Sequence, residues 1–398
     1  MWYTDGAALF KSSKISVWPL ILVINELPYS ERFKKENILV PARWCGPVQP
    51  HGNLLINASY PELSQLHKGV EFDIHLHGKQ VVKCTVLCGT GDSPARAKML
   101  NRVAHNGLGA CQACEQPGEP RDGNPGVRIF SYAPNEMKVR TDASFQRHAQ
   151  LALGLNPPRP YMGIKGPTGW SNLMPSIARG TGIDVTHQLY GGAFKKHTKL
   201  LVDPKYSSLK CNVSKAYRTK VSEKLMSIKP PHFLTRGAAS LDDYAIWKTS
   251  QHKSMCLYFG LPVPHGCLKG QYFKHYATLV AAVQYLNSDC VTPEDLDRAD
   301  RLLVKYVSYF ADLADPSYLT INFHLLLHLV RIVKELGPLW VTCCFPLESV
   351  IDDLLNLVHG TRWAEMQIAS SMQMCLGLPD LVTNLREGPS KTLCETFL

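Results

Sequence analysis

The order of apolar and polar positions predicts strands in the first part of the chain. Residues 11–28 (KSSKISVWPLILVINELP) favour a turn followed by a strand, because the segment is rich in Val, Ile and Trp. Residues 70–88 (VEFDIHLHGKQVVKCTVLC) are a second extended candidate, with a hairpin turn at HLHGK and a buried strand at VVKCTVLC. We therefore expect the first hundred or so residues to be rich in strands.

Helical signals follow these strands. Ser93 can cap a helix that has Pro94 in its first turn, and Asp92 stands just before it, past the end of the predicted buried strand. Beyond Cys114 the pattern changes, since residues 115–135 are dense in Gly and Pro and predict an irregular connection. Residues from about 140 to 318 are expected to be mostly helical.

Three helices are expected near the end of the chain. Thr292 can cap the segment TPEDLDRADRLLVKYVSYFADL, which has acids in its first turn and apolar residues every three to four positions. The segment INFHLLLHLVRIVKEL predicts a helix that ends at Gly337-Pro338. A third helix is expected to start near Pro346 and to contain Glu348 in its first turn.

Composition narrows the class of protein. The chain has 398 residues, enough for two or three domains, and a formal net charge of +10 that is compatible with an anionic partner such as nucleic acid. The longest apolar stretch, Val17 to Ile24, is too short to span a bilayer, and MWYTDG does not resemble a secretory leader. Thirteen dispersed cysteines suit a reducing compartment. We expect an intracellular soluble protein.

Four residues are candidate zinc ligands. Cys111 and Cys114 form a C-x-x-C pair, and His324 and His328 are four apart in a predicted helix, where both rings would project from one face. Two thiolates and two imidazoles make a closed tetrahedral zinc site with no open position for catalysis. The alternative is a stray turn and two core histidines. On the residues alone this alternative is favoured, because the two pairs are more than two hundred residues apart.

Acidic residues define two further candidate sites. Asp5, Asp92 and Glu348 each stand at the end of a predicted strand or the start of a helix, and such carboxylates can hold Mg²⁺. Alternatively they are a turn residue, a helix cap and a favourable charge at a helix N-terminus. Asp184 and His187, three apart in GIDVTHQLYGG, can orient each other or bind phosphate, or they can simply be a helix start with a surface histidine.

The order of these segments resembles the transposases of CACTA (En/Spm) DNA transposons. The similar blocks run through nearly the whole chain: TDGAALFKSSKISVWPLILVINELP, LCGTGDSPARAKMLN, GACQACEQPGE, GIDVTHQLYGG and LTINFHLLLHLVRIVKELGPLWVTCCFPLESV. The resemblance implies an α/β, RNase H-like core interrupted by a mostly helical insertion. It divides the chain into residues 1–114 (first part of the core), 115–318 (insertion) and 319–398 (completion of the core).

The resemblance also implies roles for the candidate residues. Asp5, Asp92 and Glu348 match the acid triad of the family, which holds Mg²⁺ or Mn²⁺ and carries out DNA strand cleavage and strand transfer. Asp184 and His187 match an accessory acid-x-x-His motif.

In related recombinases a C-x-x-C and a histidine pair bind structural zinc. With this context we expect Cys111, Cys114, His324 and His328 to form such a site.

Partners and location follow from the same resemblance. We expect DNA as the partner, a homo-oligomer, no membrane association and a nuclear location, and residues 194–210 (FKKHTKLLVDPKYSSLK) are a candidate contact to the phosphate backbone. Members of the family have more sequence before the first acid than the four residues here. We therefore expect a shortened first strand and no sequence-specific binding of transposon ends. A non-catalytic DNA- or protein-binding remnant that keeps the zinc site is the alternative function.

Overall fold

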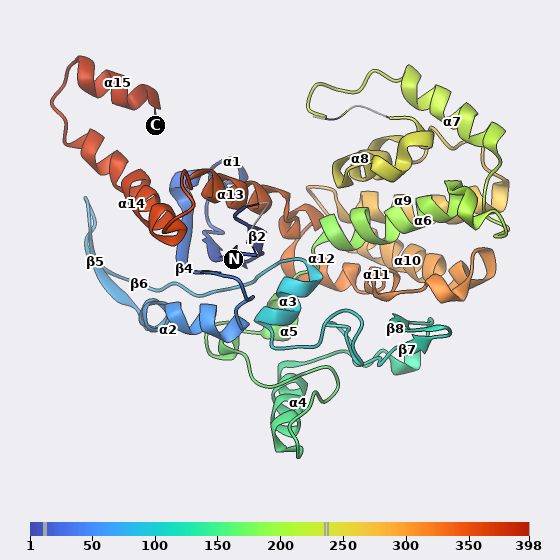
Figure 1. Ribbon diagram of the computed structural model, residues 1–398, viewed down its shortest axis with the longest axis horizontal. Coiled ribbons are helices and arrows are strands. Elements are labelled where there is room, and N and C mark those ends of the chain that lie inside the picture. Colours follow the sequence, from blue (N-terminus) through green and yellow to red (C-terminus); the bar gives the residue numbers. More distant parts are fainter. Residues whose placement is uncertain (11–13, 235, 237–238, 398) are drawn as a thin grey trace. The chain divides into compact units, whose positions relative to one another are not determined.

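The chain folds into two compact units in a computed structural model that describes residues 1–10, 14–234, 236 and 239–397 (Figure 1). The first unit is discontinuous and consists of Met1–Glu62 and Phe345–Leu398. The second unit is the intervening segment, Leu63–Cys344. The three-part division expected from the sequence has different boundaries and stays a prediction.

The first unit contains a small antiparallel sheet. Its central strand β3 (Ser16–Val23) pairs with β4 (Ile38–Gly46) on one side and with β1 (Trp2–Tyr3) and β2 (Ala7–Ala8) on the other. Most of β3 is buried because its side chains are almost all apolar, so the strand predicted here is confirmed. The turn expected before it falls partly on residues 11–13, which lie outside the described residues.

Helices complete the first unit. They are α1 (Tyr29–Arg32), most of α2 (Gly52–Lys68), α13 (Phe345–Asn356), α14 (Ala364–Thr383) and α15 (Pro389–Phe397). Val17 of β3 packs with Leu354 of α13 and Ile368 of α14, so the two sequence segments share one apolar core. The helix predicted from Pro346 is confirmed as α13.

Two hairpins in the second unit correct the strand predictions. The first joins β5 (Val70–Ile74) to β6 (Gly78–Val82), which confirms the predicted turn, but β6 is exposed and residues 83–88 are not a strand. The second joins β7 (Glu119–Arg121) to β8 (Asn124–Ile129), where an irregular connection was expected. Gly and Pro there shape a tight turn at Gly123, whose φ is +70°, between short exposed strands.

The rest of the second unit is mostly helical, as predicted. Its helices are α3 (Ser93–Met99), α4 (Asp142–Gly154), α5 (Ile177–Gly180), α6 (Lys195–Val202), α7 (Lys215–Ser227), α8 (Thr249–Ser254), α9 (Gly270–Leu286), α10 (Pro293–Leu313), α11 (Ile321–Leu326) and α12 (Leu329–Leu336). Helix α10 packs along α9 (Figure 1). Thr292 caps α10 through a reciprocal capping box with Asp295, as expected.

The helix predicted over residues 321–336 is interrupted. Residues 327 and 328 separate α11 from α12, and His328 becomes the residue that precedes α12. The predicted end at Gly337 is confirmed, since Gly337 follows α12 with a φ of +94°.

The protein is a mixed α/β protein with small antiparallel sheets. Within the described residues the named strands pair antiparallel, an isolated parallel bridge joins Gly89 to Thr181, and no mixed RNase H-like sheet is shown. None of the described helices is both long and apolar enough to cross a membrane.

Candidate metal centre

Four buried side chains from distant parts of the second unit meet at one point. Their ligand atoms, two cysteine sulfurs and two histidine nitrogens, all lie within 4.8 Å of one another. The residues are Cys111, Cys114, His324 and His328. The structure thus brings together all four residues that the sequence proposed for zinc, and this group can hold a metal ion such as Zn²⁺.

The cysteine half of the centre is a tight loop. The backbone N–H groups of Ala113 and Cys114 both donate to the Cys111 sulfur at 3.4 Å. Two N–H donors stabilise a thiolate, which is the form of cysteine that binds a metal. The loop then pairs with residues 138–140, since Glu115 N–H donates to the Lys138 carbonyl and Arg140 N–H to the Ala113 carbonyl.

The histidine half lies at the interruption between α11 and α12. Nε2 of His324 is 3.2 Å from the Cys114 sulfur and 3.2 Å from Nε2 of His328. The His324 ring also stacks on Phe130, with ring centroids 4.9 Å apart, which fixes its orientation. Both imidazoles therefore present the same nitrogen, Nε2, to the centre.

The spacing of these atoms fits a tetrahedral ion. Zn–S bonds of about 2.3 Å and Zn–N bonds of about 2.0–2.1 Å give ligand-to-ligand distances of about 3.3–3.8 Å. The two 3.2 Å contacts are close to this range, and the remaining pairs stay below 4.8 Å. Two soft thiolates with two imidazoles are also the donor set that favours zinc over Mg²⁺ or Ca²⁺.

Three arginines hold the backbone of the cysteine loop. Arg140 donates from Nε to the carbonyls of Cys111 and Cys114, and Arg102 donates from Nη2 to the Cys111 carbonyl at 2.6 Å. Arg331, from α12, donates to the Ala113 carbonyl at 3.1 Å. Local sequence patterns give no signal for these arginines, because the carbonyls they bind are 9 to 218 residues away along the chain.

Charge within the centre is unevenly shared between the two thiols. Burial raises the pKa of Cys111, but a hydrogen bond from Cys114 and the nearby His324 and His328 outweigh it, so its pKa lies well below the usual value. The hydrogen bond to Cys111, together with burial, raises the pKa of Cys114 far above the usual value. Without a metal the pair therefore keeps one proton between two sulfurs, and a bound zinc ion would displace it.

The predicted acid triad is divided between the two units. Asp5 and Glu348 belong to the first unit and Asp92 to the second. No acid triad is shown among the described residues. The magnesium site stays a prediction.

Each acid has a local role that the sequence left open. Asp92, rather than Ser93, is the N-cap of α3 and accepts a hydrogen bond from Ala95 N–H at 2.7 Å. Asp5 accepts from the Gly6 N–H at 2.6 Å. Glu348 lies in the first turn of α13, where a negative charge is favourable.

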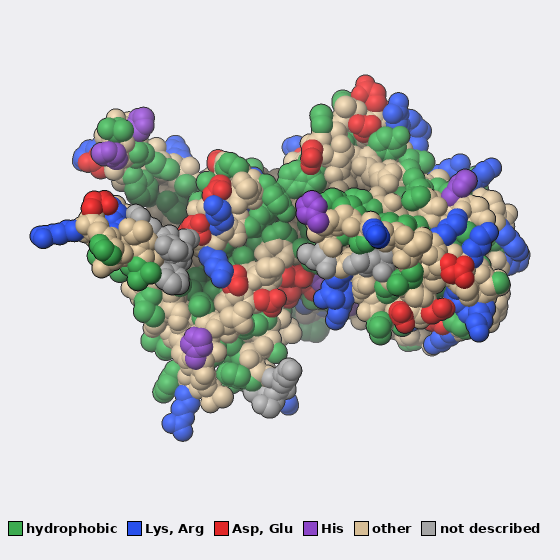
Figure 2. Space-filling view, turned by 90° about the horizontal axis from the view of Figure 1, so that it is seen from above, with side chains coloured by type: hydrophobic (Ala, Val, Ile, Leu, Met, Phe, Trp, Pro, Cys, Tyr) green, Lys and Arg blue, Asp and Glu red, His purple; other side chains and the backbone are tan. Residues whose placement is uncertain are grey.

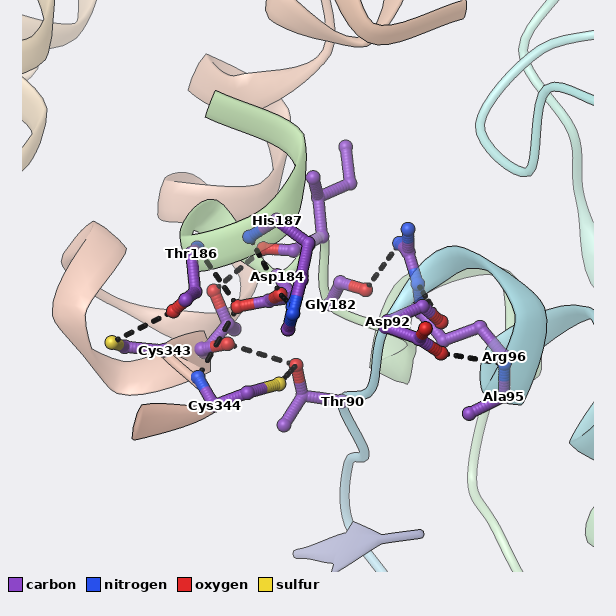
Figure 3. A network of polar contacts seen from close by, with 12 residues as sticks. Thr90, Asp92, Ala95, Arg96, Gly182, Asp184, Thr186, His187, Cys343 and Cys344 are labelled. Carbon is purple, nitrogen blue, oxygen red and sulfur yellow. Dashed lines mark hydrogen bonds and ion pairs between the residues drawn. The ribbon is translucent and has the colours of Figure 1, made fainter. Parts of the chain in front are cut away.

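Asp184 and His187 form a second polar cluster in the second unit (Figure 3). Oδ2 of Asp184 is 2.6 Å from Nδ1 of His187, at the start of a π-helical segment, Thr186–Phe194. Asp184 is fully buried, whereas 42% of the His187 side chain is exposed. The sequence spacing therefore predicted a real contact, and Asp184 fixes the ring of a histidine that reaches solvent.

The Asp184 carboxylate is held by three backbone donors. It accepts from the N–H groups of Thr186 and His187 at 2.9 Å each and of Cys344 at 3.2 Å (Figure 3). Burial raises the pKa of Asp184, but the His187 interaction and the backbone bonds outweigh it, and the pKa is lowered overall. Asp184 thus stays ionised inside the protein and ties residue 344 to the π-helical segment.

Residues 194–210, the predicted basic contact to DNA, are only partly exposed to solvent. One face of α6 is buried, and Lys196 lies over the rings of Tyr206 and Tyr318 at 4.9 and 4.3 Å. On the face drawn in Figure 2, Lys and Arg side chains are dispersed among apolar and acidic ones rather than gathered into one basic surface. Contact with a phosphate backbone remains a prediction.

Comparison of the sequence with protein families and with curated proteins finds no match. The resemblance to a transposase family therefore depends on the motifs themselves, and what it implies for function is a proposal.

Proposed function

We propose that this chain is a transposase-derived protein of the CACTA type that cleaves DNA strands and transfers them, with a structural zinc ion in its second unit. The observation that carries the proposal is the meeting of Cys114 and His324, 210 residues apart, at 3.2 Å. Cys114 belongs to the cysteine pair and His324 to the histidine pair that the resemblance assigns to one zinc site. A chance C-x-x-C has no reason to meet a histidine pair so distant in sequence.

The zinc ion would be structural because protein side chains fill its ligand positions. Four ligands complete a tetrahedral shell and leave no place for a reacting water. The ion would fasten the loop after α3 to the interruption between α11 and α12. It would thereby fix the path of the chain shortly before residue 345, where the first unit resumes.

The proposed chemistry belongs to Asp5, Asp92 and Glu348, in the RNase H-like core that the resemblance implies. These carboxylates would hold Mg²⁺ or Mn²⁺, which when bound activates an attacking hydroxyl and stabilises the leaving oxygen of a phosphodiester. The cap of α3 uses Oδ1 of Asp92 and fixes the direction of its carboxylate. His187, oriented by Asp184, would contact DNA or a phosphate. DNA as partner, assembly into a homo-oligomer and a nuclear location belong to the same proposal.

The test is DNA nicking in the presence of Mg²⁺ or Mn²⁺. Asp92→Asn is the informative variant, because asparagine still caps α3 but removes the charge that a metal needs. Asp122→Ala, at an exposed hairpin turn, is the matched control. We expect nicking by the wild type and by the control, and none by Asp92→Asn. Equal activity in all three proteins would refute the catalytic role.

A non-catalytic remnant is the second candidate. It is favoured by the local roles of Asp92 and Asp5, each of which has a backbone N–H partner of its own. In this case the zinc site would stabilise a DNA- or protein-binding fold. DNA binding that weakens with salt, without any cleavage, would support it.

A further inference from the structure

The second unit contains a cavity of about 370 Å³ that the sites above do not use. It is bounded by the start of α3, by β8, by the π-helical segment and by the first residues of α11. Its volume lies within the range of about 300–1,000 Å³ that is typical of small-molecule sites. The cavity is therefore large enough for a ligand rather than for a few waters.

Three side-chain amides line this cavity, those of Asn106, Gln188 and Asn322, and the last two lie on or beside helices. Gln188 is only 5% exposed, and its Oε1 has no hydrogen-bond partner among the described residues. Asn322 lies against Gly192, where a Cβ atom would come within 2.7 Å of the Asn322 amide nitrogen. Each amide carries a donor and an acceptor side by side, which is the pattern that pairs with the edge of a base.

The charge of the lining favours an anion. Arg128 and His105 are among the eleven lining residues, and none of those eleven is acidic. Arg128 donates from Nη1 to the Gly118 carbonyl at 3.0 Å, while its buried Nε has no partner among the described residues. One nitrogen of the guanidinium is thus anchored by the backbone, and the positive charge of Arg128 lies in the wall of the cavity.

Apolar residues complete the lining. Pro94, Val127 and Ile321 come from three different elements and offer surfaces for the face of a ring. A ligand that suits this lining has a flat ring with donors and acceptors on its edge and carries a negative charge. Nucleotides combine these features, and Asn and Gln amides pair with the edge of adenine in particular.

We propose that this cavity binds a nucleotide, with the base edge at Gln188 and Asn322. The phosphate would lie toward Arg128 and His105. The nucleotide is either free or a unit of a single-stranded nucleic acid, since both present the same chemistry. The inference concerns the cavity alone and does not depend on the proposed DNA cleavage.

The test is calorimetric titration of the full chain, without Mg²⁺, with three probes: deoxyadenosine monophosphate, deoxyribose 5-phosphate and a short single-stranded DNA oligonucleotide. We expect the sugar phosphate to bind at least about tenfold more weakly than the best probe, because it lacks the base edge. Asn322→Ala is expected to weaken binding of that probe by about tenfold, and Arg128→Gln to weaken all three. Asn135→Ala, at an exposed site outside the cavity, is the control and should bind as the wild type does.

Each outcome decides the proposal. Tight binding of the monophosphate indicates a free nucleotide, and binding of the oligonucleotide alone indicates a unit of nucleic acid. Equal affinity for deoxyribose 5-phosphate, unchanged affinity in both variants, or no binding of any probe would overturn the proposal. Asn322 and Arg128 are partly exposed, and thermal unfolding of each variant provides the check on folding.

Discussion

Arg140 holds Cys114 through its backbone: Nε of the arginine donates to the Cys114 carbonyl oxygen at 2.8 Å. The same Nε donates to the Cys111 carbonyl at 2.9 Å, so one buried side chain spans both ends of the C-x-x-C loop. Nη2 of Arg140 donates to the carbonyls of Gly109 and Met162. Arg140 therefore orients the two thiols indirectly, by bonding the backbone carbonyls of the cysteines rather than their sulfur atoms.

Replacing Arg140 is expected to loosen the metal centre. Arg140→Leu removes four hydrogen bonds to loop carbonyls but leaves all four ligands in place. Loss of a group that orients metal ligands typically lowers affinity by about 10- to 100-fold. Competition with a chromogenic zinc chelator measures the effect. Arg159→Leu, at an exposed position, is the control, and identical affinities for the two variants would contradict this role.

The purified protein is expected to contain one zinc ion per chain. Cys111→Ser should lose it, whereas Cys84→Ser, at an exposed cysteine of the same unit, should keep it. Free zinc at roughly 1,000 times its Kd contributes about 4 kcal/mol to the free energy of unfolding. Metal analysis and urea unfolding with and without chelator provide the measurements. A wild-type protein without zinc, or a stability that the chelator leaves unchanged, would argue against the centre.

The buried carboxylate of Asp184 is expected to be important for stability. Asp184→Ala would leave the N–H groups of Thr186, His187 and Cys344 without their acceptor, and the cost should be about 3 kcal/mol or more. Asp312→Ala removes an exposed aspartate and should cost little. Urea unfolding distinguishes the two variants. A loss below about 1 kcal/mol for Asp184→Ala would mean that these hydrogen bonds do not matter.

Acid is expected to destabilise the second unit through His252. Burial, with a smaller effect of Lys195, lowers the pKa of His252 to about 4 from its usual 6.5, and neither ring nitrogen has a partner among the described residues. As pH falls below 6.5, His252 is protonated in the unfolded chain but stays neutral in the folded chain. The free energy of unfolding therefore decreases between about pH 6.5 and 4. The loss from this residue at pH 5 is about 2 kcal/mol.

A substitution isolates this pH effect. His252→Leu should reduce the difference in unfolding free energy between pH 7.5 and pH 5 by that amount, whereas His232→Leu, at an exposed position, should not. Burial also lowers the pKa of His197 well below its usual value, so part of the acid sensitivity will remain. If His252→Leu retains the full pH dependence, the proton uptake must occur elsewhere.

Local signals in the sequence predicted local structure well. The cap at Thr292, the stop at Gly337 and the apolar strand β3 are all in place, because each depends on residues a few positions apart. Predictions of burial were less successful. The segment VVKCTVLC, residues 81–88, is apolar enough for a buried strand. Only its first two residues lie in a strand, the exposed β6, and residues 83–88 are not a strand, since strand formation and burial depend on what the rest of the chain places beside a segment.

The candidate zinc site shows more clearly that local sequence signals do not predict contacts between distant segments. The residue types suggested one site from Cys111, Cys114, His324 and His328, but on the residues alone two unrelated pairs were favoured. The resemblance to a family reversed that preference. The sequence also gave no sign of the interruption at residues 327 and 328, or of the three arginines around the loop. These features depend on contacts between distant segments, which periodicity does not contain.

The separation of the two ligand pairs also sets the order of events during synthesis. The ribosome makes Cys114 long before His324, which follows 210 residues later. A nascent chain can therefore offer zinc only two sulfurs until α11 has emerged, and a two-ligand site is weak and open to exchange. The four-ligand site can form only after the helices between the two pairs have been made. Tight zinc binding would therefore occur only in chains whose intervening segment has folded so that the two pairs meet.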